Sequence, residues 1–238
     1  MKSLHIITPV KDSIDTTIDT IKAIMSSDIK VPFTYTIYND FSTPENTQRL
    51  EKASKEYGFQ LVNLSDLTDH PSPNYLLVLQ KTQKEAIEAN AGLLIVESDV
   101  TVQKDTLQAL FDSALERKDC GMAAAVTTDE NGDINFPYLY AKGRKPQVYD
   151  EKKRFSFCCT LLTPTFLKAF DFHLLDPTKN WFDVTISHES IHKGFHNYLF
   201  INLPVLHRPH GSRPWKQLKY TNPLKYYWLK FTKGLDKI

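Results

Sequence analysis

Short apolar segments alternate with amphipathic helical segments along the first half of this chain, and this alternation constrains the fold more than any other feature. The apolar, β-branched and aromatic runs predict strands at residues 4–8, 33–38, 60–62 and 93–96. Apolar residues at helical spacing predict helices at about 14–25, 45–57, 76–91 and 105–117. Such an alternation is typical of a parallel, doubly wound α/β sheet.

The second half of the chain has a less regular pattern. It predicts strands at 122–126, 157–162 and 196–203, a turn at 129–133 and an irregular basic segment at 138–153. Thr163 and Pro164 are typical of the cap and first residue of a short helix, and Gly194 closes a helix predicted from Trp181 to Lys193. The length of 238 residues suits one α/β domain.

Composition excludes several classes of protein. The net charge of +1 gives no reason to expect a general polyanion-binding role, and no apolar run is long enough to span a bilayer. The N-terminal apolar run is too short for a signal peptide, so a cytoplasmic location is predicted. Three cysteines without Cys-x-x-Cys spacing argue against a disulfide framework or a thiolate zinc site, and favour buried small side chains.

Polar clusters follow three of the predicted strands, after Ile7, Tyr38 and Val96. Ligands of doubly wound sheets bind beyond such strand ends. The most informative cluster is Glu97-Ser98-Asp99, because residues i and i+2 of an extended segment point to the same side. The two carboxylates can hold one hard divalent cation, or one can hold the cation while the other accepts from a ribose hydroxyl. The alternative is a solvated loop with incidental acids, since this short motif is common.

Five motifs in order strengthen the ligand-binding interpretation. They are Ile7-Thr8-Pro9-Val10-Lys11-Asp12, Tyr38-Asn39-Asp40-Phe41-Ser42-Thr43-Pro44-Glu45-Asn46-Thr47, Glu97-Ser98-Asp99-Val100, Trp181-Phe182-Asp183 and Val205-Leu206-His207. Together they resemble glycosyltransferase family 2, the inverting nucleotide-sugar transferases. The resemblance implies the GT-A fold, a Rossmann-like, mixed but mostly parallel sheet flanked by helices. It implies one catalytic domain at 1–212, with a nucleotide-binding half at 1–102 and an acceptor-binding half at 103–212.

The resemblance also implies residue roles. Asp40 would accept from the base of the nucleotide, expected to be uracil, with Thr8 beside it. Glu97 would face the ribose or the metal, and Asp99 would bind Mn²⁺ or Mg²⁺, with His207 completing the coordination. Asp183 would be the general base that deprotonates the acceptor hydroxyl. The remaining nucleotide-binding candidates are Pro9, Asp12, Lys81 and Ser98.

Four positions depart from the family's pattern, and one is Lys11, which takes the place of the usual polar residue in the first motif. Phe41 stands where the family usually has glycine, so a different turn is expected after Asp40. Glu97 replaces an aspartate, and Phe182 stands where an acid often precedes the base. These departures keep open a non-catalytic nucleotide-sugar-binding relative. The family's "Q-x-x-R-W" motif of processive synthases is absent, which argues against a polymerising membrane synthase.

A competing motif is His188-Glu189-Ser190-Ile191-His192, which matches H-E-x-x-H. On a helix both histidines lie on one face and can bind zinc with Glu189 as base, so a zinc-dependent hydrolase is the alternative function. Against it, Lys193 follows directly, no glutamate follows Glu189, and the later histidines miss the longer zinc-binding spacing.

The C-terminal part of the chain is basic. His207, Arg208, His210 and Arg213 form a segment that either closes over a diphosphate or is a mobile basic loop, with His210 the alternative metal ligand to His207. Trp181 is an acceptor-binding candidate. Residues 213–238 are predicted to form a basic amphipathic tail, whose apolar face consists of Leu224, Tyr227, Trp228, Phe231 and Leu235. This face suits an anionic membrane surface or the catalytic domain, and the former would fit a glycan or lipid-linked acceptor in polysaccharide assembly.

Overall fold

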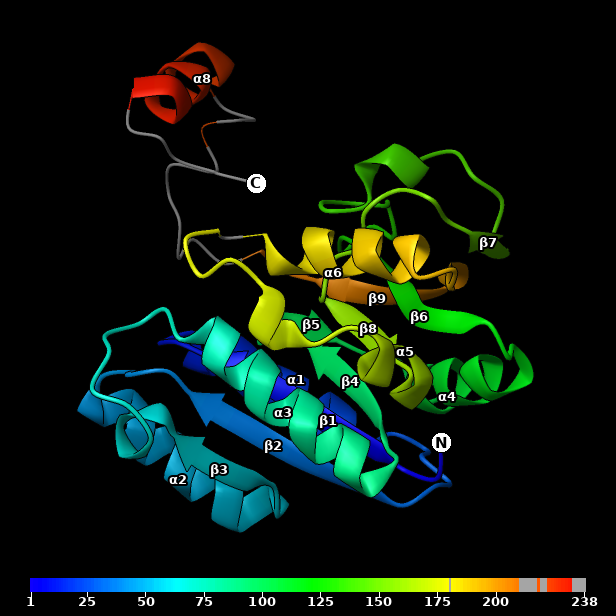
Figure 1. Ribbon diagram of the computed structural model, residues 1–238. Coiled ribbons are helices and arrows are strands. Elements are labelled where there is room, and N and C mark those ends of the chain that lie inside the picture. The colour runs from blue at the N-terminus through cyan, green and yellow to red at the C-terminus, as the bar shows by residue number, and fades with distance from the viewer. Residues whose placement is uncertain (180, 210–217, 219–221, 233–238) are drawn as a thin grey trace.

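The computed structural model describes residues 1–179, 181–209, 218 and 222–232. These residues form a mixed α/β fold built on one curled sheet (Figure 1). Its strands are β1 (Leu4–Val10), β2 (Phe33–Asn39), β3 (Gln60–Asn63), β4 (Gly92–Val96), β5 (Val100–Thr101), β6 (Cys120–Thr128), β7 (Val148–Asp150), β8 (Cys159–Leu162) and β9 (His196–His207). The strand order is β3-β2-β1-β4-β8-β6-β9-β5, with β7 also paired to β9.

The two halves of the sheet differ in strand direction. Strands β1 to β4 are parallel to one another, as the strand–helix alternation predicts. In the second half, β8 lies antiparallel between β4 and β6, while β6 and β9 are parallel. The short strands β5 and β7 both pair antiparallel with β9. The sheet is therefore mixed and mostly parallel, as expected for the GT-A fold.

Helices cover both faces of the sheet and enclose two apolar cores. The helices are α1 (Ile14–Met25), α2 (Pro44–Tyr57), α3 (Tyr75–Ala89), α4 (Thr106–Glu116), α5 (Pro164–Ala169), α6 (Phe182–His192) and α8 (Pro223–Thr232), and the 3₁₀ turns are Leu64–Asp66, Leu139–Ala141 and Phe172–Leu174. Helices α1, α2 and α4 bury their apolar residues in one core, and α3, α5 and α6 bury theirs in the other. Adjacent strand residues such as Ile6 and Ile7 enter opposite cores, because strand side chains alternate between faces.

Most predicted elements form, with informative differences at their ends. Gly58 ends α2 with a φ of 79°, and the Thr163 hydroxyl caps α5 through the Phe166 amide. Ser13 occupies the N-cap position of α1, but its side chain makes no capping hydrogen bond. Strand β1 continues through Pro9 to Val10, since its pairing with β4 ends at Ile7 and no bond is required of Pro9 on that side.

Helix α8 was predicted as amphipathic, and its apolar side chains are exposed. Leu224, Trp228 and Phe231 are 86%, 63% and 91% exposed, whereas Tyr226 is buried. In Figure 1 the helix stands apart from the layered sheet. Leu235 lies outside the described residues. In the part of the chain that the structure describes, every helix is too short or too polar to cross a bilayer.

Candidate active site

The segment after β4 carries the acidic motif into contact with the end of β9. Strand β4 is fully buried, and the Glu97 amide bonds the Cys158 carbonyl at 3.0 Å. Val100 of β5 then pairs with His207 of β9, and the Arg208 amide bonds the Asp99 carbonyl at 2.9 Å. These backbone contacts place Asp99, 7% exposed, next to His207, 5% exposed. Two residues 108 positions apart in sequence thus share one buried corner of the sheet.

The imidazole of His207 is held on both sides. Its Nδ1 lies 2.7 Å from the Phe136 carbonyl oxygen, and its Nε2 lies 3.5 Å from Asp99 Oδ2. Because a carbonyl can only accept, Nδ1 carries a proton, and in the neutral ring Nε2 keeps a lone pair directed at Asp99. Burial alone would lower the pKa of His207, but the Asp99 carboxylate outweighs it and the pKa is raised. Such a histidine, oriented by a backbone carbonyl, is the arrangement found in metal ligands.

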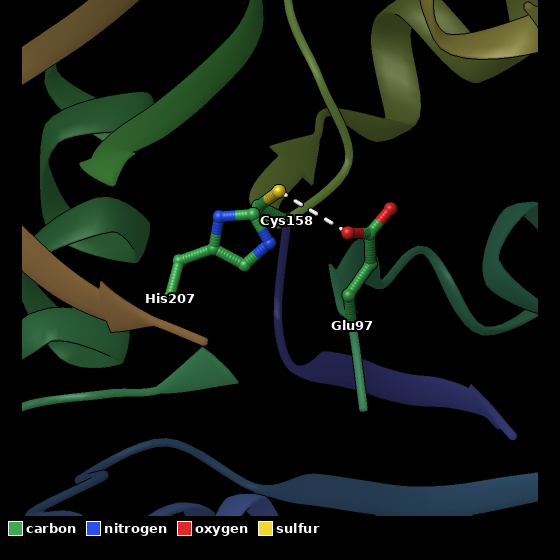
Figure 2. A group of neighbouring side chains, drawn as sticks. All are labelled: Glu97, Cys158 and His207. Carbon is green, nitrogen blue, oxygen red and sulfur yellow. Dashed lines mark hydrogen bonds between the residues drawn. The ribbon is translucent and has the colours of Figure 1, made fainter. Parts of the chain in front are cut away.

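Cys158 and Glu97 complete the corner. Figure 2 shows Glu97, Cys158 and His207 gathered together, with Cys158 Sγ 3.1 Å from Glu97 Oε2. One ligand atom from each of the three residues lies within 4.8 Å of the others. Burial, together with Glu97, raises the pKa of the Cys158 thiol well above its usual value, so at neutral pH it donates a hydrogen bond to the carboxylate.

Asp183 and Glu97 share an electrostatic effect on one side chain, Tyr75. Asp183 lies in the first turn of α6, and Tyr75 is the first residue of α3. The pKa of Tyr75 is raised well above its usual value, first by burial and then by the carboxylates of Glu97 and Asp183. The Tyr75 hydroxyl is buried and has no hydrogen-bond partner among the described residues. The carboxylates of Glu97 and Asp183 therefore both act electrostatically on the same buried phenol.

Asp40 has a different environment. Its Oδ2 accepts from the Ser72 hydroxyl at 2.7 Å and the Asn74 amide at 2.9 Å, and its Oδ1 accepts from Asn74 Nδ2 at 2.8 Å. The carboxylate, 9% exposed, thereby ties the end of β2 to the loop that precedes Tyr75. The hydroxyl of Thr8 bonds Tyr35 at 3.1 Å.

The loops after β1 and β2 brace each other. Asp12 Oδ1 accepts from the Thr43 amide at 2.7 Å, and the Asp12 amide donates to the Ser42 hydroxyl at 2.9 Å. Asp12 and Phe41 both have a φ of 57°, in the left-handed region. Phe41 thus adopts a glycine-like turn despite its side chain, contrary to the expectation of a different one, at a cost of about 1–3 kcal/mol.

Several predicted site residues make their side-chain contacts outside the corner formed by Glu97, Cys158 and His207. The Lys81 ammonium lies 2.8 Å from Glu85 Oε1 on α3. The Arg208 guanidinium bonds Asp19 at 3.2 Å and Glu130 at 3.1 Å. It lines an open hollow of about 400 Å³ between α1 and the end of β9. His210 and Arg213 lie outside the described residues.

The H-E-x-x-H segment lies on α6 as predicted, but its histidines face outward. His188 and His192 are both exposed, and His192 Nδ1 lies 3.4 Å from Glu189 Oε1. Within the described residues, the three-ligand group is that of Glu97, Cys158 and His207, and it includes neither of these histidines. The zinc hydrolase hypothesis therefore lacks a third ligand in this part of the chain.

Sequence reasoning missed three residues of the site. Asn74 orients Asp40, Tyr75 is acted on by the carboxylates of both Glu97 and Asp183, and Cys158 bonds Glu97. All three cysteines are buried, as predicted, and Cys158 in addition donates a hydrogen bond to Glu97. A polar loop before a helix was the only signal for Asn74 and Tyr75, and nothing near Cys158 indicates its partner 61 residues away.

Comparison with solved structures identifies the fold. S. aureus TarS, residues 1–349, superposes with a TM-score of 0.64 at 18% identity, covering 87% of this chain and 60% of that one. A Pyrobaculum calidifontis mannosyltransferase, in complex with GDP-Man and Mn²⁺, gives 0.63 at 11% identity, covering 96% and 64%. GalNAc-T7, with UDP, GalNAc and Mn²⁺, gives 0.66 at 12% identity, covering 97% and 48%. The fold is thus that of the GT-A glycosyltransferases, and this chain spans about half to two thirds of the length of these proteins.

Comparisons by sequence add nothing to this assignment. No protein-family model matches the chain, and no curated protein matches it either.

Proposed function

We propose that this chain is an inverting glycosyltransferase, similar to family 2, which transfers a sugar from a nucleotide donor to an acceptor hydroxyl. The observation that carries the proposal is the meeting of Asp99, Glu97 and His207 at the strand ends of a GT-A fold, with Asp183 and Glu97 both acting electrostatically on Tyr75. Active sites of α/β sheets lie at such strand ends.

The donor set fits a divalent cation. Asp99 supplies a buried carboxylate oxygen and His207 an oriented imidazole nitrogen, and Glu97 lies within reach of the same imidazole. An imidazole ligand favours Mn²⁺ over Mg²⁺, which prefers oxygen ligands. A bound cation would neutralise the charge that develops on the departing diphosphate.

The nucleotide would lie along the ends of β1, β2 and β4. TarS is described in complexes with UDP-GlcNAc and with UDP, and UDP is the donor nucleotide that we propose here. A carboxylate has about four acceptor sites, and the chain fills three of those on Asp40. The remaining site on Oδ1 would accept from the imide N–H of uracil. Glu97 or Ser98 would then contact the ribose.

Asp183 would act as the general base. Its position at the N-terminus of α6 favours the ionised carboxylate, since helix N-termini stabilise negative charge. Removal of the acceptor proton by Asp183, with attack from the side opposite the diphosphate, would invert the anomeric centre. Trp181, directly before α6, would contribute an aromatic surface for the acceptor sugar.

Helix α8 would bring the enzyme to an anionic lipid surface. Its exposed apolar side chains, Leu224, Trp228 and Phe231, accompany Lys225 and Lys230 on a helix with no acid. Aromatic and basic side chains together suit the headgroup region of a bilayer. This contact would fit a glycan or lipid-linked acceptor in cell-surface polysaccharide assembly, with the enzyme on the cytoplasmic side.

Calorimetry with UDP tests the proposal. We expect UDP to bind in the presence of Mn²⁺ and to bind at least 10-fold more weakly when the metal is chelated. Asp99→Ala should abolish the metal dependence, while the control Asp105→Ala, an exposed residue beside α4, should retain it. Metal-independent UDP binding that Asp99→Ala leaves unchanged would contradict the proposal.

A further inference from the structure

We propose that Glu97, Cys158 and His207 form a second, sulfur-containing metal site that selects Zn²⁺ and shares His207 with the proposed Mn²⁺ site. Three separate elements supply the ligands: the turn after β4, the residue before β8 and the end of β9 (Figure 2). Binding of Zn²⁺ would therefore regulate the transferase by competing for its metal position.

The geometry requires only small movements. The three ligand atoms lie within 4.8 Å of one another, and Sγ and Oε2 are 3.1 Å apart. Tetrahedral zinc with ordinary Zn–S, Zn–N and Zn–O bonds places its ligand atoms about 3.3–3.6 Å from each other. Side-chain movements that shift the ligand atoms by about 1 Å would close the site around one ion. A water, or the Asp99 carboxylate beside His207, can supply the fourth ligand.

Neighbouring groups already orient the ligands. The Phe136 carbonyl fixes the His207 ring so that Nε2 faces Cys158 and Glu97, and the Ser156 hydroxyl lies 3.4 Å from Cys158 Sγ. Such outer contacts are what holds metal ligands in place. Cys158 is 2% exposed and His207 5% exposed, so two of the three ligands need no further desolvation.

The thiol determines which metal the site selects. Sulfur ligands favour zinc and other thiophilic ions over manganese and magnesium, and zinc exceeds manganese in general affinity for mixed nitrogen, oxygen and sulfur ligands. Neither Cys120 nor Cys159, the other buried cysteines, belongs to the three-ligand group found in the described residues. Cys158 is therefore the residue that would distinguish this site from one made of carboxylates and imidazole alone.

Binding has a defined proton balance. The Cys158 S–H proton that bonds Glu97 is released to solvent as a thiolate–zinc bond forms, and the Glu97 oxygen exchanges that hydrogen bond for the metal. No electron transfer is involved. Since the same His207 lone pair cannot bind two ions, zinc and manganese should exclude each other.

Cobalt titration of the metal-free protein tests this site without any nucleotide. Co²⁺ replaces zinc in such sites and gives a near-ultraviolet charge-transfer band when sulfur is a ligand. We expect one Co²⁺ per chain with this band, its displacement by one Zn²⁺, and proton release on binding. Cys158→Ser should lose the band and weaken Zn²⁺ binding at least 10-fold, whereas Cys159→Ser, altered at the next residue, should keep both.

A second variant keeps the test decisive if Cys158→Ser does not fold. In Cys120→Ala/Cys159→Ala the only thiol is Cys158, and the cobalt band should remain. Absence of the band from the wild-type protein, or its loss from this double variant when folded, would overturn the inference. Failure of UDP to bind with Mn²⁺ would instead count against the proposed transferase and would leave the zinc site standing.

Discussion

Two acidic positions that follow the strands on either side of β1 differ in what surrounds them. Asp40, after β2, accepts three hydrogen bonds, from Ser72 and Asn74. Asp99, after β4, instead faces the imidazole of His207, close to Glu97 and Cys158. Both carboxylates are buried to a similar extent. Burial alone therefore does not distinguish them, and the chemical type of their neighbours does.

The different neighbours of Asp40 and Asp99 suit the two carboxylates to different roles. Hydrogen bonds from the chain's own amides stabilise the loop that leads into α3, whereas a carboxylate beside an imidazole can bind a cation. Asp40 thus holds Asn74, the residue directly before Tyr75, on which Glu97 and Asp183 both act electrostatically.

The largest expected effect is that of substituting Asp183, the proposed general base. Asp183→Asn should lower the transfer rate about 10²- to 10⁴-fold, because the amide cannot take the acceptor proton. UDP affinity measured by calorimetry should stay within about 2-fold, since the base does not hold the nucleotide. Asp176→Asn, an exposed position before α6, is the control. Unchanged transfer by Asp183→Asn would remove this residue from the mechanism.

Asp40→Ala should reduce stability most among the carboxylate substitutions. Losing three hydrogen bonds and leaving the Asn74 amide buried should lower the free energy of unfolding by about 3 kcal/mol. Thermal unfolding should show a drop of about 6–12 °C for a chain of this length. Asp69→Ala, an exposed acid in the same loop, should change stability by less than about 0.5 kcal/mol. An unchanged melting temperature in Asp40→Ala would contradict this stabilising role of the carboxylate.

A smaller effect is expected from the titration of His207. Its pKa is raised in the folded state, so the protonated ring contributes stability that is fully present below the ordinary pKa of about 6.5. That contribution is lost as pH rises through the raised folded-state pKa. Metal binding needs the neutral ring, so Mn²⁺ affinity should rise over the same interval.

Melting temperatures in chelator, recorded from acidic to alkaline pH, check the sign. The wild-type protein should lose stability relative to His207→Asn as pH rises through this interval. An opposite slope would mean that burial, rather than Asp99, dominates the environment of His207.

The smallest effect on stability is expected in α8. Trp228→Ala and Phe231→Ala should change the free energy of unfolding by less than about 0.5 kcal/mol, because both side chains are exposed. Each should nevertheless weaken sedimentation with anionic phospholipid vesicles several-fold. Leu174→Ala, at another exposed leucine, should leave vesicle binding unchanged. Equal binding by wild-type protein and both variants would favour a different role for this face.

Local patterns predicted the elements well, and they failed where pairing is long-range. The run Leu93–Val96 is predicted as a buried strand from its own residues, and the polar residues that follow predict where the strand ends. Strands β5 and β7 were not predicted, because each has two or three residues that extend only by pairing with β9. The segment at 138–153 was predicted as irregular, although it contains β7, because pairing with β9 cannot be predicted from local residues.

The sequence alone determined the alternation of strands and helices and the placing of acids at strand ends, since both depend on residues near one another along the chain. Only the tertiary structure decided which acid accepts hydrogen bonds from a neighbouring loop and which lies beside an imidazole. Asp40 meets Asn74 and Asp99 meets His207 across 34 and 108 positions, and such meetings depend on strand order and not on local preference. The environment of Cys158 was likewise not predictable from local residues, because it is set by the carboxylate of Glu97, which follows a different strand.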